Sequence, residues 1–81
     1  AISLYPNPAA DKLNIEFNLQ NPEGETTIKI NDLLGKEVLT TSTFLTSNKT
    51  ITIDINTLAK GVYFIQVVND TTTKVFKFIK Q

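Results

Sequence analysis

LAKGVYFIQV, the stretch at residues 58–67, decides the fold that we expect for this chain. Gly61 and Tyr63 stand at the entry to an apolar strand, three and five residues after Leu58. This spacing is typical of a tyrosine corner, in which the Tyr hydroxyl binds an upstream main-chain carbonyl at the start of a sandwich strand. We therefore predict that Leu58 plugs the end of a β-sandwich, that Gly61 allows an unusual backbone turn and that Tyr63 closes the corner.

The sequence around this stretch alternates apolar and polar residues with the period of a β-strand. Residues 50–55 (TITIDI) place three Ile on one face, and residues 13–19 (LNIEFNL) repeat the pattern. No helix of useful length is indicated, although residues 56–60 have room for one turn. We predict one domain, Ala1–Gln81, folded as a seven-stranded antiparallel β-sandwich. The predicted strands are residues 2–5, 12–19, 26–31, 37–45, 50–55, 62–69 and 73–80.

Turn residues separate these segments. Asp32 is expected to hydrogen-bond the backbone of a tight hairpin in which Gly35 takes the left-handed position. Further turns are predicted at residues 21–24, 47–48 and 69–71. Apolar residues of segment 37–45 fall on both faces, which predicts a β-bulge that shifts its register once.

Composition excludes several classes of function. The sequence has eight Lys and eight Asp or Glu, with no Arg, and this balance disfavours nucleic-acid binding. It has no Cys and no His, so zinc, haem and thiol or Ser–His chemistry are unavailable and no cofactor is expected. No apolar run approaches the roughly 20 residues of a membrane helix, so we expect no direct membrane insertion. We also find no signal peptide and expect no catalytic activity.

Two prolines one residue apart stiffen the segment YPNPA at residues 5–9. Because each proline fixes its own φ and restricts the residue before it, we interpret the segment as a rigid corner between the first two strands. The alternative, a proline-rich ligand for an aromatic groove, would need a longer polyproline stretch.

The last segment, residues 73–81, is apolar on both faces and carries Lys74, Lys77 and Lys80. One interpretation puts Phe76 and Phe78 inward and leaves residues 75, 77 and 79 as an exposed strip; the opposite assignment remains open. The lysines either protect an edge strand from aggregation or mark an edge that a receptor reads by strand addition and charge. In the second case one flank of the strand, with its free carboxylate, stays open to a partner.

The order of these pieces resembles the type A C-terminal sorting domain of the type IX secretion system of Bacteroidota. The resemblance rests on LYPNPA at residues 4–9, LNI at 13–15, DLLGKEV at 32–38, LAKGVYF at 58–64 and KFIKQ at 77–81. It spans nearly the whole chain in the right order. The matched structural positions are Tyr5, Pro6, Asn7, Pro8, Asp32, Gly35, Leu58, Gly61 and Tyr63.

The resemblance implies an immunoglobulin-like β-sandwich and a non-catalytic export tag on the same precursor as an N-terminal cargo domain. It further implies recognition by translocon or shuttle proteins, frequent removal by a surface sortase, and passage through the periplasm to the cell surface or medium. The residues to which it assigns partner binding are Lys74, Lys77, Phe78, Ile79, Lys80 and Gln81.

The rival hypothesis is an accessory adhesive or carbohydrate-binding module of a secreted enzyme. Sugar-binding modules use exposed aromatic platforms, whereas this sequence has no Trp, two Tyr and five Phe, most of which the core requires. A solvent-facing row of aromatic side chains would favour the rival.

Overall fold

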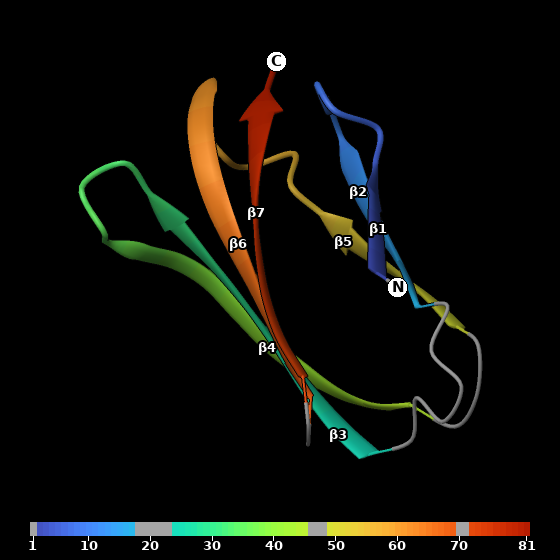
Figure 1. The fold of residues 1–81 in the computed structure, drawn as a ribbon. Helices are drawn as coiled ribbons and strands as arrows, with labels where there is room; N and C mark the ends of the chain where they lie inside the picture. Colours follow the sequence, from blue (N-terminus) through green and yellow to red (C-terminus); the bar gives the residue numbers. More distant parts are fainter. Residues whose placement is uncertain (1, 18–23, 46–48, 70–71) are drawn as a thin grey trace.

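Two antiparallel β-sheets pack face to face in the computed structural model of the chain, which describes residues 2–17, 24–45, 49–69 and 72–81 (Figure 1). Seven strands form in these residues, as predicted, and each described limit lies within two residues of the prediction. Residues 18 and 19 of the second predicted strand, and most of the three other predicted turns, lie outside the described residues. The strands are β1 (Ile2–Tyr5), β2 (Lys12–Phe17), β3 (Gly24–Asp32), β4 (Glu37–Leu45), β5 (Lys49–Asp54), β6 (Gly61–Asn69) and β7 (Thr72–Lys80).

The strand order is β1-β2-β5 in one sheet and β4-β3-β6-β7 in the other. Consecutive strands either form a hairpin or cross between the sheets, which gives the immunoglobulin-like arrangement that the resemblance implies. It differs from a constant-type immunoglobulin domain in one respect, because β4 pairs with β3 rather than with β5. As a result β4, β5, β1 and β7 are the four edge strands.

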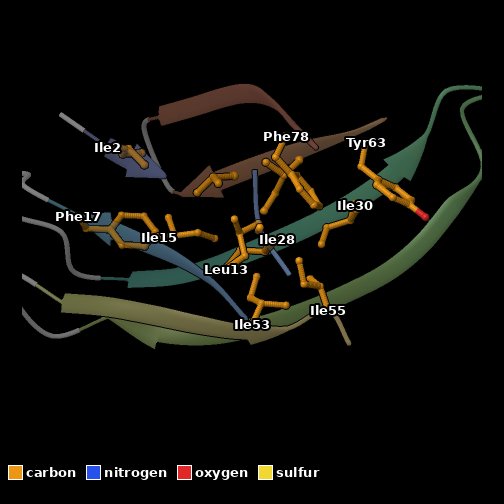
Figure 2. Close-up of a cluster of buried hydrophobic side chains, with 13 residues drawn as sticks. Ile2, Leu13, Ile15, Phe17, Ile28, Ile30, Ile53, Ile55, Tyr63 and Phe78 are labelled. Carbon is orange, nitrogen blue, oxygen red and sulfur yellow. The ribbon is translucent and has the colours of Figure 1, made fainter. Parts of the chain in front are cut away.

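The core lies between the sheets and is built from the inward side chains of alternating residues (Figure 2). Its largest fully buried members are Phe17 of β2 and Phe78 of β7, which come from opposite sheets. The other buried hydrophobic residues of the described chain are Ile2, Ala9, Leu13, Ile15, Ile28, Ile30, Ile53, Ile55, Tyr63, Ile65 and Val67. The period-two pattern of the sequence therefore selects the buried face of each strand.

The tyrosine corner forms as predicted. The Tyr63 hydroxyl donates to the Ala59 carbonyl at 2.6 Å, and the Tyr63 ring stacks on Phe78 with its centroid 5.5 Å away. Gly61 has a φ of 152°, a conformation that residues with a Cβ rarely adopt, and Leu58 packs against the core. The corner thus joins the start of β6 both to the preceding turn and to the last strand.

The β3–β4 hairpin also follows the prediction. Asp32 Oδ1 accepts hydrogen bonds from the N–H groups of Leu34 and Lys36, each at 2.9 Å, and Gly35 has a φ of 86°. The expected bulge lies at Val38, because Ile30 pairs with Leu39 whereas the next residue of β3 pairs with Glu37. Val38 and Leu39 consequently both pack against the core.

The segment at residues 5–9 is a corner, as interpreted from its prolines, and it has a second role. Ala9 is completely buried and forms a parallel bridge with Lys80 of β7. The Ala9 N–H donates to the Ile79 carbonyl and the Gln81 N–H donates to the Ala9 carbonyl, both at 2.8 Å. The corner therefore joins the two sheets on the side of the sandwich that β7 occupies.

The Asn7 side chain extends this contact, because its amide group hydrogen-bonds to β7 as the main chain of a neighbouring strand would. Its Nδ2 donates to the Lys77 carbonyl and its Oδ1 accepts from the Ile79 N–H, both at 3.0 Å. We name the four hydrogen bonds that Asn7 and Ala9 make to β7 and Gln81 the clasp.

Replacing Tyr63 with Phe tests the corner. The change removes the hydroxyl bond to Ala59 and keeps the ring stack, so we expect a loss of about 1 kcal/mol in the free energy of unfolding. Urea denaturation measures it. Tyr5→Phe is the matched control, because Tyr5 is half-exposed and its hydroxyl bonds to none of the residues that the structure describes. Equal stabilities of the two variants would contradict the assignment.

Asn7→Ala tests the clasp. Loss of two hydrogen bonds should lower the free energy of unfolding by roughly 1–2 kcal/mol and accelerate amide exchange at Ile79. Amides of β7 that face β6 are the internal reference in the exchange measurement, and Asn56→Ala, at an exposed Asn, is the control variant. Unchanged protection at Ile79 would show that the clasp does not hold this edge.

Candidate functional site

β7 is the edge strand of the four-stranded sheet and pairs with β6 along its whole length. The main-chain N–H and C=O groups that point away from β6 belong to every second residue of β7. The clasp binds some of these outer groups, at Lys77, Ile79 and Gln81. Within the described chain, the outer groups of Thr73 and Val75 have no hydrogen-bond partner. The outer edge of β7 was predicted from the sequence to be open to a partner. It is open only over the first part of the strand.

The structure decides which face of β7 is buried. Phe78 is fully buried and Phe76 partly so, whereas Val75, Lys77 and Ile79 are exposed on the opposite face. This confirms the assignment that puts the two Phe inward. The inward residues attach the strand to the core, and the outward residues face solvent.

The six residues assigned to partner binding do not form one surface. Lys77 and Ile79 lie on the outer face, Lys74 is exposed on the side of Phe76 and Phe78, and Gln81 is exposed beyond the end of the strand. Phe78 has no exposed surface and Lys80 is only 8% exposed, with its Nζ donating to the Gln81 main-chain oxygen at 2.8 Å. In this fold a partner reaches Lys74, Lys77, Ile79 and Gln81, but not Phe78.

An apolar strip occupies the outer face of β6 and β7. The register places Val62 opposite Ile79 and Phe64 opposite Lys77. Val75 lies two residues before Lys77 and therefore on the same face of β7. Val75 is 62% exposed, Ile79 42% and Phe64 38%, while Val62 is half-buried. We call these five residues the outer strip. Val62 and Phe64 are not among the residues assigned to partner binding from the sequence, although the apolar character of both faces of residues 61–68 is the signal for them.

The lysines near the strip form no ion pair with any described residue. In the described part of the chain one ion pair forms, between Lys12 and Asp54 at 3.5 Å, and both partners are exposed. The Asn56 N–H, which donates to Asp54, and the Lys12 ammonium together hold the pKa of Asp54 below its ordinary value. Lys74 and Lys77 take part in no ion pair with the described residues, so both ammonium groups are available.

The one cavity that we describe, of about 330 Å³, opens between the edges of β4 and β5. Aliphatic and hydroxyl side chains line it, together with Asp54, whose carboxylate already binds Lys12. No group of three His, Cys, Asp or Glu residues with metal-binding geometry occurs among the described residues. Nor does the described chain contain a helix with the length and apolar character to cross a membrane.

Exposed aromatic side chains are scattered over the described surface. Tyr5 lies on β1 of one sheet, whereas Phe44 and Phe64 lie on β4 and β6 of the other. Phe44 pairs with Glu25 and Phe64 pairs with Asn31, both on β3. Because these two partners lie about 20 Å apart along β3, the positions of Phe44 and Phe64 are equally far apart in that direction. These positions do not make the solvent-facing row that a carbohydrate-binding module requires.

Comparison with known proteins identifies the family. Residues 3–81 match the family described as "Secretion system C-terminal sorting domain". No curated protein matches the chain at a significant level. The family match, which covers nearly the whole chain, agrees with the seven-stranded sandwich and with the resemblance of its motifs. The chain therefore belongs to the C-terminal sorting domains of the type IX secretion system, which are non-catalytic secretion and sorting tags.

Proposed function

We propose that the secretion machinery recognises this tag through the exposed side chains of β7 while an N-terminal cargo domain crosses the outer membrane. A translocon or shuttle protein binds first, and a surface sortase then usually removes the tag. The cargo passes through the periplasm and ends on the cell surface or in the medium. The export role follows from the family, whereas the binding residues are our proposal.

One observation carries this proposal: β7 combines a firm anchor with an accessible face. Phe78 is fully buried on one side of the strand while Lys77 and Ile79 are exposed on the other. A receptor that accepts many unrelated cargos needs a feature that belongs to the tag, and an anchored edge strand provides one with little entropy cost on binding.

The six assigned residues divide into two roles. Lys74, Lys77, Ile79 and Gln81 are positioned to contact the receptor, and the two lysines steer the encounter at low ionic strength. Phe78 and Lys80 act indirectly, because they are buried and fix the strand. Thr73 and Val75, whose outer main-chain groups bond to none of the described residues, are the place where strand addition can begin.

Lys77→Ala tests the proposal in a surface-display assay. The chain is fused to an inert fluorescent protein that carries an inner-membrane signal, and the fusion is expressed in a bacterium with the secretion system. Because Lys77 is exposed and forms no ion pair with the described residues, we expect an unchanged melting temperature. Surface fluorescence should fall roughly threefold or more, as expected for a lost contact charge.

The matched control is Lys36→Ala, at an exposed lysine of the β3–β4 hairpin on another part of the molecule. Its display should equal that of the unmodified tag. Normal display of Lys77→Ala would contradict the proposed role of this residue, and a lowered melting temperature would show that the role is structural.

A further inference from the structure

We propose that the outer strip is a docking surface for a protein partner that presents a carboxylate surrounded by apolar side chains. The inference rests on the proposed function, since it names the chemistry of the partner that reads the tag. It also moves recognition from the edge of β7 to the outer face of β6 and β7 together.

The clasp directs a partner to this face. Asn7 occupies the Lys77 carbonyl and the Ile79 N–H, and Ala9 occupies the Ile79 carbonyl. A partner strand therefore cannot pair with these main-chain groups unless it displaces the corner. Lys77 and Ile79 remain accessible through their side chains, and these point away from the core onto the outer face.

The strip has the composition of a docking surface. Four of its five side chains are apolar, and three of those are more than a third exposed. Val62 faces Ile79 and Phe64 faces Lys77 across the two strands, so the side chains are direct cross-strand neighbours. Partly exposed apolar side chains that gather on one face of a sheet, as Val62, Phe64 and Ile79 do, are a feature of protein-contact sites.

Lys77 determines the charge that the partner must supply. Its position on the strand lies opposite Phe64 and between Val75 and Ile79 on the same face, and its ammonium has no ion pair within the described chain. Glu37 occupies the same row of the sheet but lies three strands away, at about 14 Å. A partner that covers the strip removes water from Lys77, and a buried, uncompensated ammonium would oppose binding. A carboxylate opposite Lys77 removes this penalty.

The same charge disfavours a second copy as the occupant. Two copies that faced each other across the centre of the strip would bring two Lys77 ammonium groups together, and like charges in a desolvated interface cost binding energy. A different protein with an acidic, apolar surface fits better.

The test compares substitutions in and outside the strip in the display assay. Phe64→Ser and Lys77→Glu should each reduce display roughly tenfold, and Lys77→Gln should reduce it less, because it removes the attraction without adding repulsion. Phe44→Ser is the matched control, since Phe44 is 64% exposed on β4 of the same sheet. Lys36→Glu controls for the charge reversal. Both controls should display normally.

Phe64 belongs to β6, so Phe64→Ser distinguishes docking on the outer strip from recognition through β7 alone. Normal display of Phe64→Ser with defective Lys77→Ala would overturn the strip and leave recognition by β7 intact. Normal display of both would overturn both. If Phe64→Ser lowers the melting temperature, Phe64→Thr takes its place, because Thr is well accommodated in a strand and the change still removes the exposed ring from β6.

Two further measurements exclude other occupants. Sedimentation of the 81-residue chain should show a monomer, and a dimer that Phe64→Ser abolishes would overturn the inference in favour of self-association. Vesicles of phosphatidylcholine and phosphatidylglycerol should not bind the chain. Vesicle binding that Lys77→Glu abolishes would instead assign the strip to an anionic membrane surface.

Discussion

Burial of Phe78 is the contact on which the rest of the structure depends. The Phe78 ring is fully buried and stacks on Tyr63, whose hydroxyl holds the turn before β6. Loss of a buried Phe side chain typically costs 3–5 kcal/mol, and a domain of this length has a total stability of roughly 4–12 kcal/mol. A sandwich this small therefore needs its last strand in order to fold.

The alternation of β7 couples this anchor to the surface that the strand presents. Phe76 and Phe78 attach the strand to the core, and Val75, Lys77 and Ile79 consequently face solvent in a fixed arrangement. The clasp adds a second constraint, because Asn7 and Ala9 occupy the outer main-chain groups near the end of the strand. The surface that we propose for recognition is thus held in place by contacts from both ends of the chain.

Local patterns in the sequence predicted most of the fold. Strand alternation and the turn residues between segments located the seven strands of the described chain, and the residue types at Asp32, Gly35, Gly61 and Tyr63 predicted the hairpin and the tyrosine corner. These features succeed because each depends on residues that are close in sequence. The bulge was predicted for β4, and the pairing with β3 locates it at Val38.

The candidate site was harder to predict because its contacts join distant parts of the chain. The Asn7 side chain lies 70 residues from Lys77, and no local period encodes their pairing. For the same reason neither the partial cover on the edge of β7 nor the burial of Lys80 could be predicted from the sequence pattern. The outer strip also requires the register of β6 against β7, which only the structure supplies.

Phe78→Ala in the display fusion tests most directly whether the folded last strand is the signal. The substitution leaves every exposed residue of β7 in the sequence but removes the anchor that arranges them. Circular dichroism should show a domain that is unfolded or strongly destabilised at the growth temperature, and surface display should be lost. Display at the unmodified level from an unfolded Phe78→Ala domain would contradict the account, because the machinery would then read the linear sequence of the segment rather than its fold.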